Sequence, residues 1–311
     1  MALPIRIALV PSKVQIPPSE LTDVASAISK QVDRDFQPLW NIDATVDSFT
    51  DLKNVPIDYW PVIVTNNVQG AAGYHQDKNG QPFALVEHDS QWALTASHET
   101  LEMLADPFGR RLHAGNVLDQ AIKVGVKPGR VRYLVEVCDP CEAGKFAYQV
   151  NGVTVSDFYT PAYFDSTAAP GTRYSYTGAV TAPRIVLDEG YISWHDTVTD
   201  HWFQLRMFPD DISSKVPHVV DLTNNQVFSR MLAEGMPVRA AVDRVTPNPD
   251  YARSLQHSAR IMSKNFDVAA DAARAANAEH LTTTIREVIS RAPRRPTPSG
   301  SGPSRKGRGS R

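Results

Sequence analysis

The chain has 311 residues and a formal net charge of −2 at pH 7, and 42% of its residues are hydrophobic, which is enough for a buried core. This length allows one α/β core with about 100 residues to spare, and the near-neutral charge gives no general reason to expect nucleic-acid binding. The presence of only two cysteines excludes a disulfide-built scaffold.

No targeting signal stands out. The N-terminal residues lack the basic and apolar segments of a signal peptide, and no apolar run is long enough to span a membrane. We therefore expect a cytoplasmic protein without a membrane partner, although signal-independent export or packaging into a particle would leave the same pattern.

Strand and helix patterns alternate through the first third of the chain. Hydrophobic runs and turn residues predict strands over 5–10, 44–49 and 60–65, a helix over 18–36 with Ser19 as its N-cap, and a hairpin from 73 to 86. Residues 91–105 have no Pro or Gly and are rich in Ala, Leu, Glu and Met, so we expect a helix that ends before Asp106-Pro107. This order predicts an α/β (α+β) fold in which a mixed sheet precedes a largely buried helix.

The most informative stretch lies on this last helix and reads His98-Glu99-Thr100-Leu101-Glu102. In the common zinc motif, two histidines at i and i+4 share one helix face and bind the metal, while the glutamate after the first histidine is the general base. Here Glu102 takes the place of the second histidine. The motif therefore predicts His98 and Glu102 as metal ligands and Glu99 as the catalytic base.

Charge on this helix is confined to one stripe, which holds His98, Glu99, Glu102 and Asp106 and no cation. Carboxylates at i+3 and i+4 spacings repel one another, and a bound cation would remove that repulsion. The alternative is a plain polar face with a buried hydrogen-bond network. We favour the metal site.

A further ligand is expected from farther along the chain. Residues 131–137 look like a strand that delivers Glu136 and Asp139 at its end, and Asp106 is a rival because it lies just past the helix. Structural roles compete, since Asp106 is also placed to brace the turn before Pro107, and Glu136 to pair with an arginine. One imidazole with two or more carboxylates can hold Zn²⁺, our first choice, and also suits Ca²⁺ or Mn²⁺.

The order of strand, helix, several strands and then the motif helix resembles the zincin metallopeptidases. The closer resemblance is to an uncharacterised bacterial group of zincin-like proteins with a Ser-His-Glu-x-x-Glu-x-x-x-Asp-Pro helix, here residues 97–107, and a later Glu-x-x-Asp segment, here residues 136–139. This resemblance covers residues 3–208. It implies a zincin-like fold and a peptidase in which a metal-activated water attacks a peptide carbonyl with Glu99 as general base. It also implies that the strand over 80–86 is an edge that holds an extended peptide.

Other chemistry-bearing residues fit the site less well. Cys138-Asp139-Pro140-Cys141 has no second cysteine pair and no thioredoxin-like context, so we expect it to shape the ligand loop rather than to act in redox chemistry. Several side chains are candidate hydrogen-bond donors to an oxyanion: Tyr74, His75, Tyr159, Tyr163, His195 and His201.

The C-terminal part of the chain changes character. After residue 151 we expect short strands and aromatic loops, including one strand over 160–164. Helices are predicted over 225–234, 236–245 and 251–290. We divide the chain into a zincin-like metal-binding domain over 1–210, a helical extension over 211–290 that packs on it or on a partner, and a tail over 291–311.

The tail carries seven Lys or Arg and no acid among many Pro, Gly and Ser, so we expect disorder and at most weak nucleic-acid binding. Two function classes follow from the whole pattern. The first is a zincin-type metallopeptidase acting on peptides or proteins. The second is a non-catalytic metal-binding module whose C-terminal helices dock a larger assembly.

Overall fold

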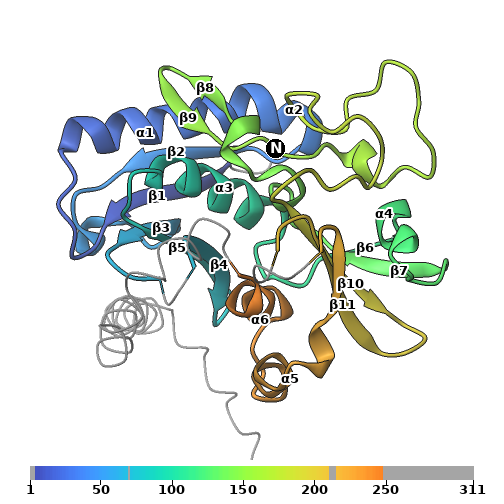
Figure 1. Cartoon of the computed structure of the whole chain (residues 1–311). Helices are drawn as coiled ribbons and strands as arrows, with labels where there is room; N and C mark the ends of the chain where they lie inside the picture. The colour runs from blue at the N-terminus through green and yellow to red at the C-terminus, as the bar shows by residue number, and fades with distance from the viewer. Residues whose placement is uncertain (1–3, 69–70, 210–214, 248–311) are drawn as a thin grey trace, which may run out of the picture.

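The computed structural model describes residues 4–68, 71–209 and 215–247. Over these residues the chain forms a mixed α/β structure with two five-stranded sheets and a small two-stranded sheet (Figure 1). The helix predicted over 251–290 and the tail over 291–311 lie outside the described residues.

The first sheet contains the N-terminal strands in the order β2-β1-β3-β5-β4. Their bounds are Ile5–Pro11 for β1, Ala44–Ser48 for β2, Tyr59–Thr65 for β3, Gly73–Lys78 for β4 and Gln81–Glu87 for β5. Strands β1, β2, β3 and β5 are parallel, and β4 is an antiparallel edge strand. Parallel strands that are covered on both faces read as continuous apolar runs, which explains the sequence of β1.

Helices α1 (Pro18–Gln31) and α3 (Trp92–Ala105) lie over one face of this sheet (Figure 1). The core on that face joins Ile7 of β1 to Leu21 of α1 and Leu101 of α3, all of them buried. Helix α1 continues through a π-helical turn at Val32–Phe36 into the short helix α2 (Gln37–Trp40). The two-stranded sheet of β8 (Tyr148–Val150) and β9 (Val153–Val155) packs on α1 through Ala27.

The second sheet is antiparallel, in the order β12-β11-β10-β7-β6. Its bounds are Leu112–Asn116 for β6, Arg130–Leu134 for β7, Tyr191–Asp196 for β10, His201–Arg206 for β11 and His218–Asp221 for β12, with α4 (Asp119–Lys123) between β6 and β7. Helices α5 (Gln226–Ala233) and α6 (Val238–Val245) pack on this sheet through a buried cluster that includes Phe208, Phe228 and Val242.

Most predicted elements are confirmed, including the motif helix, the hairpin and the two helices after residue 225. Three differ. Helix α1 has Pro17 rather than Ser19 as its N-cap, because Pro18 occupies the first helical position and no side chain caps the end. The strand predicted over 131–137 ends at Leu134. Residues 160–164 form a 3-10 turn at Pro161–Phe164 instead of a strand.

The predicted peptide-holding edge is also wrong. Strand β5 lies between β3 and β4 and hydrogen-bonds to both, so its backbone groups are already paired. The hairpin turn at Asn79 and Gly80, whose φ angles are 55° and 82°, brings β4 back along β5 and makes β4 the edge.

Candidate metal centre

Helix α3 buries its charged stripe instead of turning it to solvent. Glu99 is 3% exposed and Glu102 is completely buried, while Leu101 and Leu104 pack into the main core. Buried ionised carboxylates are costly unless they are paired or hydrogen-bonded. The partners of Glu99 and Glu102 therefore decide what this face of the helix does.

His98 is the point at which the motif helix meets the later acidic segment. Its Nε2 atom lies 3.4 Å from Oε2 of Glu102, one turn along α3, and 3.2 Å from Oδ1 of Asp139. Asp139 begins a 3-10 turn, Asp139–Cys141, in the loop after β7. The backbone N–H of Cys138 donates to Oε1 of Glu102 at 3.1 Å and so ties this loop to α3.

Gly190, just before β10, allows the same loop to approach the second sheet. A Cβ atom at Gly190 would lie 2.7 Å from the carbonyl oxygen of Asp139 and 2.9 Å from the carbonyl carbon of Pro140. Backbone atoms cannot move away as a flexible side chain can. The absence of a side chain at Gly190 is therefore part of what positions Asp139.

The contacts of His98 fit a divalent cation. Ligand atoms around a tetrahedral zinc with bonds of about 2.0–2.1 Å are about 3.3 Å apart, which matches both contacts of Nε2. Asp139 is fully buried, yet neither of its oxygens accepts a well-formed hydrogen bond from the described residues. With Glu142, on the same loop, His98 and Asp139 form a set of side chains that could hold a cation, since their ligand atoms all lie within 4.8 Å of one another, whereas Glu102 belongs to the set formed by His75 and Glu99.

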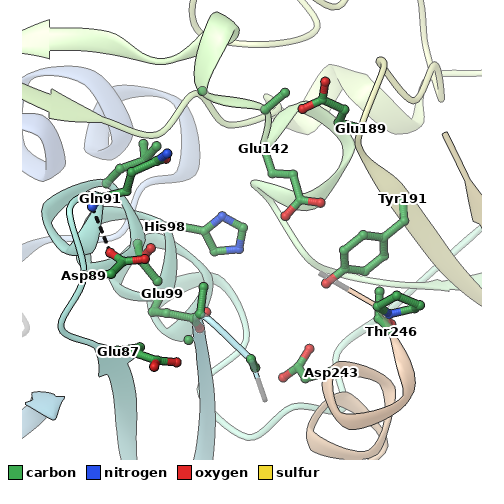
Figure 2. Close-up of a pocket in the computed structure, with 18 of the residues that line it drawn as sticks. Glu87, Asp89, Gln91, His98, Glu99, Glu142, Glu189, Tyr191, Asp243 and Thr246 are labelled. Atoms are coloured by element: carbon green, nitrogen blue, oxygen red, sulfur yellow. Dashed lines mark hydrogen bonds between the residues drawn. The ribbon is translucent and has the colours of Figure 1, made fainter. Parts of the chain in front are cut away.

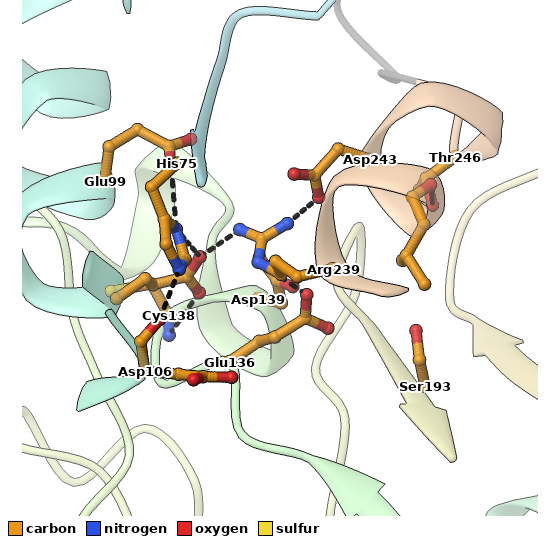
Figure 3. Close-up of polar contacts among 12 residues, drawn as sticks. His75, Glu99, Asp106, Glu136, Cys138, Asp139, Ser193, Arg239, Asp243 and Thr246 are labelled. Atoms are coloured by element: carbon orange, nitrogen blue, oxygen red, sulfur yellow. Dashed lines mark hydrogen bonds and ion pairs between the residues drawn. The ribbon is translucent and has the colours of Figure 1, made fainter. Parts of the chain in front are cut away.

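An arginine of α6 supplies the cluster with a positive charge. Arg239 is buried and contacts Glu102, Glu136 and Asp243 (Figure 3). Its Nε atom lies 2.7 Å from Oε1 of Glu136, and its backbone N–H donates to the carbonyl of Gly109. Glu136 is therefore paired with an arginine, one of the two roles that the sequence left open. The pattern of residues 236–245 gave no sign that Arg239 points inward.

The charges around His98 shift its titration and that of its partners. Burial lowers the pKa of His98, but the carboxylates of Glu102 and Asp139 outweigh burial and raise that pKa well above its usual value. Burial raises the pKa of Glu102, yet Arg239 and His98 hold it well below its usual range. Burial raises the pKa of Asp139 and of Glu136. The guanidinium of Arg239 thus offsets part of the negative charge of the cluster, and a metal would compete with a proton for Nε2 of His98.

Asp106 has the turn-bracing role and belongs to neither set of described side chains that could hold a cation. It follows the last residue of α3, and its Oδ2 accepts the backbone N–H of Arg111 at 2.7 Å. Arg111 in turn donates from its guanidinium to the carbonyl of Ala105. Asp106 therefore closes the end of the helix.

His75 of β4 forms a second group with the motif glutamates. Its Nδ1 lies 3.4 Å from Oε2 of Glu99 and 3.9 Å from Oε2 of Glu102, and its Nε2 lies 3.1 Å from the carbonyl oxygen of Asp106. A carbonyl only accepts, so Nε2 carries a hydrogen and Nδ1 faces the two carboxylates. His75, Glu99 and Glu102 are a second set of side chains that could hold a cation. The sequence suggested His75 only as an oxyanion donor.

A pocket of about 560 Å³ lies beside His98 and Glu99 (Figure 2). It is lined by α3, the loop after β5, the segment that begins β4, the loop that contains Glu142, and α6. Glu142, Tyr191 and Asp243 line it, and none of the three was predicted as a site residue, although the segment that begins at Tyr191 was expected to wall one side of a cleft. The six predicted oxyanion donors do not line it: Tyr74, His75, Tyr159, Tyr163, His195 and His201.

The two cysteines are free and buried. Burial raises the pKa of both thiols well above the usual value, which keeps them protonated and poorly nucleophilic. Cys138 contributes its backbone N–H to Glu102, as described above. The segment that contains the pair is thus tied to α3, and the loop-shaping role of the cysteine side chains stays a prediction.

A scan against family models and searches of curated proteins and of solved structures found no match to this chain. In the part of the chain that the structure describes, no helix has both the length and the apolar character needed to cross a membrane. The case for a function therefore depends on the geometry of the site itself.

Proposed function

We propose that this chain is a metal-dependent peptidase of zincin type. In this proposal His98, Glu102 and Asp139 hold a divalent cation, with Zn²⁺ as the first choice, and Glu99 is the general base. One observation carries the proposal: Nε2 of His98 faces oxygens of Glu102 and Asp139 at ligand spacing, and His98 and Glu99 line the same pocket.

The chemistry assigned to the chain's own residues is proton transfer and substrate positioning. When bound, a divalent cation acts as a Lewis acid toward a peptide carbonyl and increases the acidity of water. Glu99 then accepts a proton from the attacking water on a carboxylate oxygen and passes it to the leaving amine. His75 lies against Glu99 at 3.4 Å and helps to fix its orientation.

The arrangement of the first sheet supports the zincin-type assignment. A strand, a helix, further strands, an antiparallel edge strand and then the motif helix follow one another along the chain. We propose that an extended substrate pairs with β4, whose first residue, Gly73, lines the pocket. A Cβ atom at Gly73 would lie 2.8 Å from Oε1 of Glu99, so glycine allows this edge to pass close to the base.

The test is metal-dependent cleavage by the full chain. Denatured protein and peptide libraries are incubated with it from about pH 6 to about pH 9, with Zn²⁺, Mn²⁺ or Ca²⁺ supplied in turn. We expect cleavage that a chelator abolishes. The variant Glu99→Gln keeps its metal content but loses about 10² or more in turnover, the usual scale for loss of a general base. Glu234 is exposed at the C-terminal end of α5, and Glu234→Gln is the matched control, which keeps full turnover.

A non-catalytic metal-binding module is the second candidate. The observation that favours it is the contact of Arg239 with Glu102, since a carboxylate already paired with a guanidinium is a weaker electron donor. In that case metal raises stability and no substrate is cleaved under any of the conditions above. Tight metal binding without cleavage would replace the peptidase proposal with this one.

A further inference from the structure

The pocket beside His98 has an acidic wall. Six of its lining residues carry carboxylates: Glu87, Asp89, Glu99, Glu142, Glu189 and Asp243. They come from the end of β5 and the loop after it, from α3, from the loop after the turn Asp139–Cys141, from the loop before β10 and from α6. They therefore surround the space from several sides (Figure 2).

Little positive charge in the pocket offsets the negative charge of these carboxylates. Among the described residues that line the pocket, Arg239 is the single Lys or Arg, and its guanidinium already contacts Glu102, Glu136 and Asp243. A cleft lined by one sign of charge concentrates ligands of the opposite sign, because low-dielectric walls focus the field. The charge balance therefore favours a cationic guest.

Tyr191 points independently to a polar ligand. Tyr191 is only 7% exposed, and its ring packs edge-on against the ring of Phe208. Its hydroxyl points into the pocket (Figure 2) and forms no hydrogen bond within the described residues. A hydroxyl that opens into the pocket and has no protein partner there is available to hydrogen-bond a polar guest.

We propose that this pocket binds the charged side chain of a lysine or arginine in a peptide, attracted by the carboxylates that surround it, among them Glu87 and Glu189, and hydrogen-bonded to Tyr191. The assignment of that peptide as a substrate rests on the proposed function. Binding itself does not, because Glu87, Glu189 and Tyr191 belong neither to the candidate metal ligands nor to the base. A guanidinium or ammonium group would contribute its N–H donors to both carboxylate and phenol oxygens.

The test compares two blocked pentapeptides that differ in one residue, arginine or its neutral isostere citrulline, at the central position. Each peptide is labelled with a fluorophore, and its affinity for the full chain is measured by anisotropy in the presence of EDTA, where metal-dependent cleavage does not occur. We expect the arginine peptide to bind about tenfold or more tightly than the citrulline peptide at low ionic strength, and salt to reduce the difference.

Variants then locate the preference. The double variant Glu87→Gln/Glu189→Gln removes two charges with little change of shape, and we expect it to abolish most of the preference for the arginine peptide. We expect Tyr191→Phe to reduce that preference. Glu234→Gln removes one charge outside the pocket and leaves the preference intact. Circular dichroism spectra that match the wild type confirm that each variant folds.

Equal affinity for the two peptides, no measurable binding of the arginine peptide at about 1 mM, or a preference unchanged in the double variant would each overturn the inference. The two proposals fail separately. A preference for arginine without any metal-dependent cleavage leaves the cationic site and removes the peptidase, whereas cleavage that ignores basic residues does the reverse.

Discussion

Replacing Arg239 by methionine tests whether the guanidinium holds the carboxylate cluster together. Arg239 contacts Glu102, Glu136 and Asp243, and its removal leaves three buried acids without their shared cation. Methionine fills much of the volume, so the loss is electrostatic more than steric. Breaking a buried ion pair by removal of one partner costs about 3–5 kcal/mol, and we expect Arg239→Met to lower the free energy of unfolding by that amount.

The assay is urea unfolding of the full chain at neutral pH in EDTA, followed by tryptophan fluorescence and by circular dichroism. Arg230→Met on the neighbouring helix α5 is the control, because Arg230 is exposed and its loss should cost little. Repeating the titration with excess Zn²⁺ should restore part of the stability of Arg239→Met, since a bound cation replaces some of the missing charge. A loss below about 1 kcal/mol in EDTA would refute the account of the cluster as one held by Arg239.

Three further predictions concern the ligand loop and a separate buried carboxylate. Asp139→Asn should weaken Zn²⁺ binding by about tenfold or more, whereas Asp106→Asn should lower stability and leave the Zn²⁺ affinity nearly unchanged. Isothermal titration calorimetry measures the Zn²⁺ affinity of both variants. Gly190→Ala should displace the carbonyl of Asp139 and lower both the Zn²⁺ affinity and the melting temperature. Gly129→Ala, at a glycine with open space around it, is the control, and equal behaviour of the two variants would count against the role of Gly190. Asp35 is buried and accepts hydrogen bonds from Tyr148 and Tyr176. Burial raises the pKa of Asp35, but Arg34 and these tyrosines outweigh burial and lower it. The stability that it contributes is present above its unfolded pKa of about 3.9 and is lost as pH falls through the lower folded value, so Asp35→Asn should cost about 1–3 kcal/mol at neutral pH and less in acid. A cost that stays constant into acid would contradict this linkage.

Local patterns in the sequence were sufficient to predict the helix that carries the site. Composition and the following proline set the bounds of α3, and the i, i+4 spacing of His98 and Glu102 put both on one face. The hairpin before it was equally visible, because Asn79-Gly80 favours the positive φ angles that its turn adopts. These features depend on neighbours in the sequence.

The remaining parts of the site depend on contacts between distant segments. The sequence could not decide between Glu136 and Asp139, because the partner that captures Glu136 is Arg239, about 100 residues later in a helix without a motif. It could not order the strands of the sheet either, so the edge was assigned to β5 instead of β4. Pairing across the chain is decided by packing, which leaves little trace in a local pattern.

The central claim is that His98, Glu102 and Asp139 hold a divalent cation. Crystals of the full chain soaked in Zn²⁺, measured on both sides of the zinc absorption edge, test it directly. We predict one anomalous peak about 2.0–2.2 Å from Nε2 of His98 and from carboxylate oxygens of Glu102 and Asp139, absent in His98→Ala. A map without a peak there, or with its peak between His75 and Glu99 instead, would contradict the assignment.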